Sequence, residues 1–231
     1  RGNGHQLYSN LYLNFGVDGT QQYEGGWNEW GSDLGFTYQG AMQSEISVGL
    51  APNQEFFDGV TYHSFRKSAS ASFHPGRDLQ LGFSVRQGET IDFTNSRDAE
   101  FLTLSPFATL NVGRHFQGTV TYDRETLSTK AGSRVYRVDL PQATLFYHFN
   151  RRAFIRTIIQ YQDVELHPEQ YVVPVDARDQ SLASQLLFSY RIDAQTVFLV
   201  GYSDNYLGNS QLDLRQNGRT VFLKLSYAWL L

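Results

Sequence analysis

The sequence alternates between apolar and polar residues along almost all of its 231 residues. Because successive side chains of a β-strand point to opposite faces, this alternation indicates strands with one apolar and one polar face. Twelve segments follow the pattern, and the first contains Leu7, Leu11, Leu13, Phe15 and Val17. The others lie at 30–38, 42–50, 65–73, 79–85, 102–110, 120–122, 143–149, 153–161, 182–190, 198–202 and 221–229. The chain is therefore predicted to be an all-β protein of about twelve antiparallel strands.

The expected strands are long, and the segments between them alternate between short and long. Each strand should cover about ten to thirteen residues, whereas strands of soluble proteins cluster near about 5–6 and a tilted bilayer-crossing strand needs about 9–11. Short turns are expected at 39–40, 74–77, 113–114, 150–151 and 193–194, and long polar connections at 18–26, 52–60, 87–98, 124–133, 163–179 and 204–218. Tight periplasmic turns alternating with long outer loops are typical of outer-membrane barrels.

A soluble sandwich or a soluble lipid-binding barrel also alternates, with its apolar face turned inward. Three features favour the membrane interpretation. The strands are long, their polar face suits a wet lumen, and aromatic residues lie at both ends of their apolar face. The aromatic residues near the long connections are Phe15, Trp30, Phe65, Tyr122 and Tyr161. Those near the short turns are Tyr38, Phe73, Phe116, Tyr147, Phe149, Tyr190 and Trp229.

Composition narrows the function classes further. The chain has no cysteine, which removes disulfides, thiolate metal sites and cysteine nucleophiles. The formal net charge of −4 argues against nucleic acid as a partner. No stretch approaches the 18 consecutive apolar residues of a membrane-spanning helix. Without a linker or low-complexity tract, residues 1–231 are expected to form a single barrel domain, either complete or the last strands of a larger barrel.

The candidate lumen-lining residues are the charged and amide residues on the polar face of the expected strands. A charge on the lipid side would cost about 2–4 kcal/mol near the midplane, so these side chains are expected to be inside, either wet or paired. The set consists of Asp33, Glu45, Arg66, Arg86, Gln117, Arg156, Gln185 and Lys224. After closure of the barrel, the Lys224 side chain should point across the lumen toward Asp33. Lys67 falls on the apolar parity, which predicts a bulge or a side chain that snorkels to an interface.

The last segment, 221–229, carries alternating aromatic residues and resembles the C-terminal signal that the outer-membrane insertion machinery reads. Tyr227 and Trp229 are the candidate signal residues. Two further residues, Leu230 and Leu231, follow the last aromatic, where such signals usually stop.

Enzyme signatures are weak throughout the sequence. His63 and Ser64 near a long connection suit a rim-type lipase or protease, but a catalytic triad depends on geometry and not on adjacency. The acidic residues Asp92, Asp98, Glu100, Asp163 and Glu165 lack the spacing of a calcium loop, and the six histidines lack zinc-ligand spacing. No cofactor, no metal and no enzymatic activity are therefore expected.

The last eighty or so residues resemble a specific family of bacterial outer-membrane proteins of unknown function. Its members carry an N-terminal module like the family 9 carbohydrate-binding domains, followed by a C-terminal barrel. The segments that carry the resemblance are 150–156, 160–162, 186–190, 196–206 and 222–227, of which 196–206 is the most specific. The resemblance implies that this chain is only the barrel region, or only its later strands.

The expected function is a structural or porin-like role in the bacterial outer membrane. The barrel would let small polar solutes pass, or anchor a partner or the missing carbohydrate-binding module. Expected partners are outer-membrane lipid and lipopolysaccharide and the insertion machinery, with other subunits or a carbohydrate-binding module as further candidates. The rim-type lipase or protease and the soluble lipid-binding barrel remain alternatives.

Overall fold

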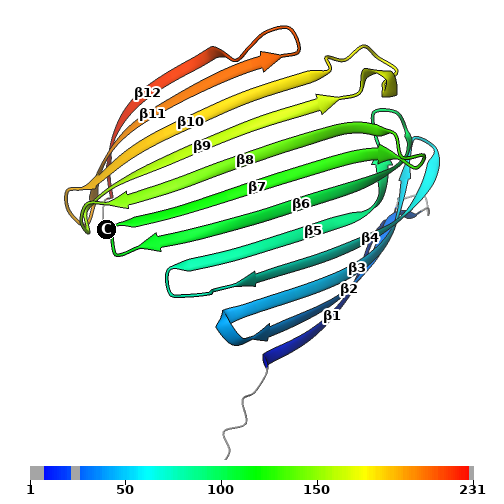
Figure 1. The fold of residues 1–231 in the computed structure, drawn as a ribbon, viewed down its shortest axis with the longest axis horizontal. Helices are drawn as coiled ribbons and strands as arrows, with labels where there is room; N and C mark the ends of the chain where they lie inside the picture. The colour runs from blue at the N-terminus through cyan, green and yellow to red at the C-terminus, as the bar shows by residue number, and fades with distance from the viewer. Residues whose placement is uncertain (1–7, 22–26, 229–231) are drawn as a thin grey trace, which may run out of the picture.

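Twelve antiparallel strands form one sheet in which each strand pairs with its neighbours in chain order (Figure 1). The computed structural model describes residues 8–21 and 27–228. The strands are β1 (Tyr8–Gln21), β2 (Trp27–Gly40), β3 (Ser44–Phe57), β4 (Val60–Phe73), β5 (Leu79–Asp92), β6 (Arg97–Val112), β7 (Phe116–Thr129), β8 (Arg134–His148), β9 (Ala153–Leu166), β10 (Arg178–Arg191), β11 (Thr196–Asn209) and β12 (Arg215–Tyr227). Short 3₁₀ helices occupy Ala41–Gln43 and Pro168–Gln170. The predicted all-β class and the twelve antiparallel strands are confirmed.

The sheet is curled but open. Its strand order ends at β1 and at β12, and within residues 8–21 and 27–228 no ladder joins these two strands. Figure 1 shows both edge strands curving away from the viewer, so the convex face is turned toward the reader. The predicted closure of β12 against β1 is therefore not present in this structure. Within the described part of the chain, no helix has the length and hydropathy needed to cross a membrane.

The register of neighbouring strands steps steadily toward the long connections. A row of cross-strand partners starts at Phe15, in the middle of β1, and passes through Lys67 on β4 and Thr126 on β7. It ends at Arg178, the first residue of β10. A barrel needs a stagger in one direction because its strands must tilt against the barrel axis. The open sheet therefore has the stagger of a barrel wall.

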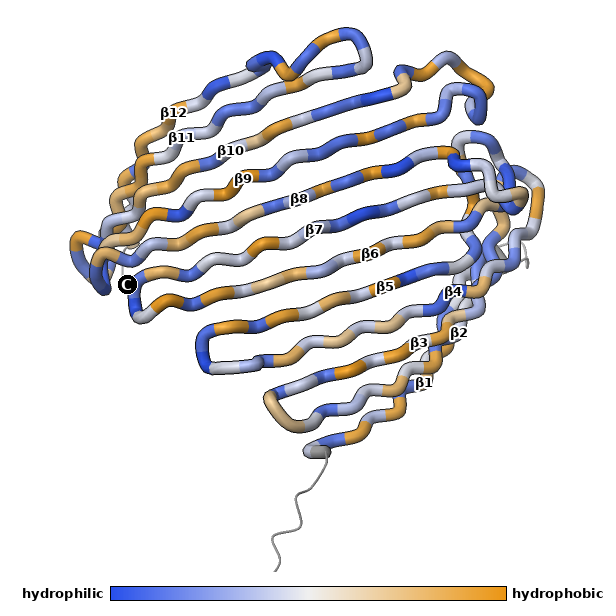
Figure 2. Tube along the Cα trace, in the orientation of Figure 1, coloured by the Kyte–Doolittle hydropathy of each residue, from blue (hydrophilic) through white to orange (hydrophobic). Residues whose placement is uncertain are grey.

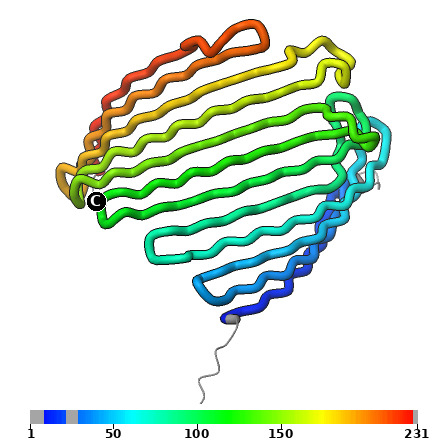
Figure 3. The backbone as a smooth tube through the Cα atoms, in the orientation of Figure 1, coloured from blue at the N-terminus to red at the C-terminus, as the bar shows by residue number. Residues whose placement is uncertain are grey.

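Strands are longer than the alternation predicted, because pairing continues into polar residues. They span 13 to 16 residues, and most of the expected long connections are short (Figure 3). The predicted loop at 52–60 shrinks to Asp58-Gly59, whose positive φ angles of 50° and 77° suit a two-residue hairpin turn. Backbone hydrogen bonds do not require apolar side chains, so the polarity of a segment did not mark the ends of its strand. The 167–177 connection remains long.

Two further predictions about local structure need correction. The turn expected at Gln39-Gly40 lies at Ala41–Gln43, since the left-handed conformations needed to reverse the chain fall on Met42 and Gln43. For Lys67 a bulge or a snorkelling side chain was predicted; the bulge is absent, because the ladders of β4 with β3 and β5 pass Lys67 without a shift. The Lys67 ammonium instead lies 5.6 Å from the centre of the Phe65 ring.

The cross-strand register sorts the side chains onto two faces, because directly opposed residues project to the same side. The convex face is apolar across the sheet, and its large side chains are exposed, with Leu13 at 74% and Leu223 at 70%. Two rows illustrate it: Leu13, Phe36, Val48, Ala69, Val85 and Leu104, and Phe73, Leu81, Ala108, Val120, Ala143 and Ile159. In Figure 2 the strand ends beside the long connections are mostly hydrophilic in β7–β10.

The short turn between β8 and β9 provides a test of how the hairpins are held. The Asn150 side-chain oxygen accepts hydrogen bonds from the backbone N–H groups of Arg152 at 2.8 Å and Ala153 at 3.0 Å. We expect Asn150→Ala to lower the free energy of unfolding by about 1 kcal/mol, because both amides lose their acceptor. Urea unfolding followed by tryptophan fluorescence measures the change. Asn150→Asp keeps the acceptor and Arg151→Ala removes only a neighbouring side chain, so equal losses in all three variants would contradict the assignment.

Candidate functional site

All eight candidate lumen residues lie on the concave face. The register connects them to the serine-rich side of β4, since Glu45 opposes Ser72 and Arg86 opposes Ser68. Farther along the sheet, Gln117 opposes Phe146, which in turn opposes Arg156. The shared parity of the set follows from the alternation, and the structure places it on one surface.

A cavity of about 580 Å³ brings three of these residues together on the concave face. Its lining includes Asp33 of β2, Arg66 of β4 and Arg86 of β5, with Ser68 and Ser70 between them. Within the described residues, no ion pair joins Asp33 to either arginine. One acidic and two basic side chains therefore line the same hollow.

Glu45 lies in a second cavity of about 300 Å³, which it shares with Ser72 and Asp123. Its carboxylate accepts a hydrogen bond from Gln39 Nε2 at 2.8 Å. The predicted approach of Lys224 to Asp33 depended on closure, and in the open sheet these residues belong to opposite edges.

The concave face is less uniformly polar than the sequence interpretation assumed. Near the short turns of β8 and β9, the rings of Phe146 and His148 stack at 6.2 Å, and Phe154 lies 5.6 Å from His148. Arg156 stands between Phe146 and Leu187 of the neighbouring strands. This aromatic patch was missed because alternation within one strand does not reveal which residues of neighbouring strands become adjacent.

The 167–177 connection folds over the concave face at the opposite end of the strands. The His167 amide donates to the Val135 carbonyl at 3.0 Å, and Tyr171 packs against a buried cluster of Ala99, Leu127 and Val135. Burial is the main cause that raises the pKa of the Tyr171 phenol, so this side chain stays neutral where it packs. The loop thereby narrows the long-connection end of the concave face.

An ionic contact secures this loop to the sheet. Arg97 of β6 donates through Nε to Asp92 at 2.9 Å and through Nη2 to the Gln170 carbonyl at 3.0 Å. The Asp92 side chain is only 3% exposed. Loss of Arg97 would therefore leave a buried carboxylate without its partner, which costs more stability than breaking a surface ion pair. The sequence offered one signal for the loop: the apolar run Tyr171, Val172 and Val173 within a polar connection.

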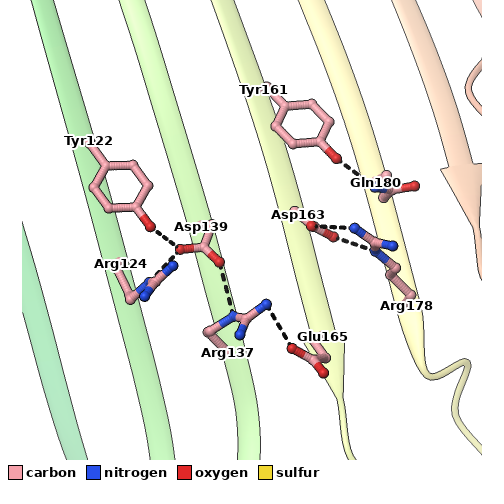
Figure 4. A network of polar contacts seen from close by, with 9 residues as sticks. All are labelled: Tyr122, Arg124, Arg137, Asp139, Tyr161, Asp163, Glu165, Arg178 and Gln180. Carbon is pink, nitrogen blue, oxygen red and sulfur yellow. Dashed lines mark hydrogen bonds and ion pairs between the residues drawn. The ribbon is translucent and has the colours of Figure 1, made fainter.

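A network of ion pairs and tyrosines runs along the convex face at the same end of the strands (Figure 4). Arg124 donates to Asp139 at 2.6 Å, and Arg137 lies 3.0 Å from the other oxygen of that carboxylate. Arg178 binds Asp163 in a bidentate manner, at 2.8 Å and 2.7 Å. Asp163 was predicted to be a solvated loop residue, and it lies instead in β9 because the strand extends into polar sequence.

Tyrosine hydroxyls bind the carboxylates of this network and that of Asp204 on β11. Tyr122 donates to Asp139, and Gln180 donates to the hydroxyl of Tyr161. On β11, Tyr202 and Tyr206 both donate to Asp204, at 2.9 Å and 3.0 Å. An aromatic ring with a polar tip is the side chain typical of a boundary between lipid and water.

The remaining candidate residues give mixed results. Tyr227 ends β12, whereas Trp229 lies outside the described residues. His63 opposes Gln54 on one face, and Ser64 opposes Asn53 on the other, so this adjacent pair does not form a catalytic dyad. Within the described part of the chain, no cluster of three or more acidic or histidine side chains is suited to hold a metal ion.

No family model matches the sequence, and no curated protein is significantly similar to it. The resemblance to the outer-membrane family with a carbohydrate-binding module therefore remains a prediction.

The loop contact on the concave face can be tested with a matched pair of variants. Tyr171→Ser should loosen the 167–177 connection, because the ring no longer packs on Ala99, Leu127 and Val135. We expect hydrogen exchange of the His167 amide to accelerate about tenfold or more. Val172→Ser is the control, since Val172 is 88% exposed. Equal exchange rates in both variants and in the original protein would show that Tyr171 does not hold the loop.

Proposed function

We propose that this chain forms the wall of a β-barrel in a bacterial outer membrane. The observation that carries the proposal is the exposed apolar face that continues across the sheet on its convex side. Soluble monomers rarely expose contiguous apolar patches larger than a few hundred Å². Transfer of apolar surface into lipid is favourable by about 25 cal/mol per Å², so a bilayer is the environment that best accommodates this face.

In a bilayer the two edge strands must find partners, because unpaired backbone groups in hydrocarbon cost several kcal/mol each. With an even number of strands, β1 and β12 run in opposite directions and are suited to antiparallel pairing. Both present apolar residues to the convex side, including Leu13 and Phe15 on β1 and Leu223 and Leu225 on β12. We propose that membrane insertion closes the sheet, either through this pair or through further strands of a larger barrel.

The concave face supports a structural or porin-like role. The hollow holds the charged side chains of Asp33, Arg66 and Arg86 together with serine and apolar residues, and the 167–177 loop covers the long-connection end of the same face. Passage of small polar solutes fits this arrangement. The resemblance described above adds a second form of the role, in which the barrel anchors a carbohydrate-binding module or another partner. Lipopolysaccharide and the insertion machinery are the accompanying partners.

A soluble lipid-binding barrel is the second candidate function. The aromatic patch around Phe146, His148 and Phe154 on the concave face favours it, since an acyl chain would bind there. Such a barrel, however, would leave the much larger apolar face in water. The membrane proposal therefore explains more of the surface.

The absence of cysteine allows a direct test of which face meets lipid. Leu223→Cys and Lys224→Cys place single thiols on opposite faces of β12. In protein inserted into vesicles, a fluorophore at 223 should be quenched by brominated lipid, whereas the thiol at 224 should react with a water-soluble maleimide. Equal water accessibility at both positions, with no lipid quenching at 223, would contradict the membrane proposal.

Conductance separates a pore from an anchor. Removal of two positive charges from the concave face in Arg156→Gln/Lys224→Gln should shift the selectivity of purified protein in planar bilayers toward cations, because the lumen becomes more acidic. Arg77→Gln/Arg114→Gln, in the short turns, removes the same charge outside the lumen and is the control. No measurable conductance in the original protein or in either variant would exclude the pore and leave the anchor role.

A further inference from the structure

Three carboxylates on the convex face near the long connections, those of Asp139, Asp163 and Asp204, are each covered by a more exposed arginine. Asp163 is 14% exposed beneath Arg178 at 50%, and Asp204 is 7% exposed beneath Arg219 at 56%. Asp139 is 14% exposed beneath Arg124 at 42%. The set of these arginines with Arg137 is called the arginine row below. Although each pair is formally neutral, the groups that reach solvent are mainly the guanidinium ions.

The buried carboxylates hold the guanidinium groups in place. Arg178 is fixed through Nε and Nη2, and Arg137 contacts Asp139 on one side and Glu165 on the other, the latter at 2.8 Å. Arg124 is hydrogen-bonded to Asp139 through Nε, and its side chain is 42% exposed. A guanidinium that is already oriented loses less side-chain entropy when it binds an anion.

The position of the row relative to the apolar face defines what it meets. On β7, β9 and β11, a tyrosine precedes the polar residue by two positions on the same face, as in Tyr122 and Arg124 or Tyr161 and Asp163. The Arg124 guanidinium lies 5.6 Å from the centre of the Tyr122 ring, and that of Arg219 lies 5.9 Å from Tyr202. The row thus begins where the apolar band ends, and the proposed membrane placement would put it at the height of the lipid headgroups.

We propose that the arginine row binds the phosphate groups of a phosphorylated glycolipid, the lipid A portion of the outer leaflet. The inference rests on the proposed membrane placement and specifies the surface that contacts lipopolysaccharide. Guanidinium forks match phosphate oxygens in a bidentate manner, and charge-assisted hydrogen bonds of this kind are about twice as strong as neutral ones. The row runs from β7 to β12, so the lipid would bind along one side of the wall.

Charge-neutral double variants test the site without changing the net charge. Asp163→Asn/Arg178→Gln and Asp204→Asn/Arg219→Gln each remove one whole pair, which avoids leaving a buried carboxylate unpaired. Asp78→Asn/Arg114→Gln makes the same chemical change at exposed residues of the short turns and is the matched control. Arg178→Lys/Arg219→Lys keeps the charge but loses the fork, and it remains informative if a pair-removal variant fails to fold.

The measurement is mass spectrometry of intact complexes between purified protein in detergent and diphosphorylated lipid A. We expect each pair-removal variant to raise the dissociation constant about tenfold and the lysine variant to raise it less, whereas the control should match the original protein. Lipid A without phosphates should bind all the proteins equally.

Two failures are distinguishable. Equal affinity of the original protein and all variants for diphosphorylated lipid A would overturn the site, even if the protein inserts normally into phosphatidylglycerol vesicles. A protein that associates with neither phosphatidylglycerol nor lipid A vesicles would overturn the membrane placement itself, and the inference with it.

Discussion

Backbone hydrogen bonding between neighbouring strands is the interaction on which this structure depends. The buried hydrophobic cluster of the described residues is small, comprising Ala99, Leu127 and Val135, so side-chain packing alone does not hold the sheet. Each strand is held by the ladders to its neighbours. Because successive side chains along each paired strand point to opposite faces, the ladders also create the apolar convex surface and the polar concave surface.

At the end of the sheet beside the long connections, the two faces carry different polar interactions. On the concave side, the pairing of Arg97 with Asp92 and Gln170 holds the 167–177 loop against the sheet. On the convex side, Asp139, Asp163 and Asp204 are covered by arginines, and tyrosines mark the edge of the apolar band. Buried carboxylates thus fix arginines on both faces of the sheet.

Much of the fold was predictable because period two is a local property of a strand. Strand number, antiparallel order and the shared face of Asp33, Arg86 and Lys224 all followed from it. The ends of strands were not predictable in the same way, since pairing continued through polar residues to the strand ends at Phe57 and Thr129. The arginine row went unnoticed for this reason, because Asp163 and Arg178 were placed in a loop.

The sequence by itself determined that this protein is an all-β chain of about twelve strands with one apolar and one polar face, because the alternation is visible within the sequence of each single strand. Only the tertiary structure decided which residues of different strands meet: Arg178 with Asp163, Tyr171 with Leu127, and Phe146 with Phe154. It also decided that β1 and β12 remain apart. These outcomes depend on register and curvature, which arise from the sum of all the strand pairings and not from any one segment.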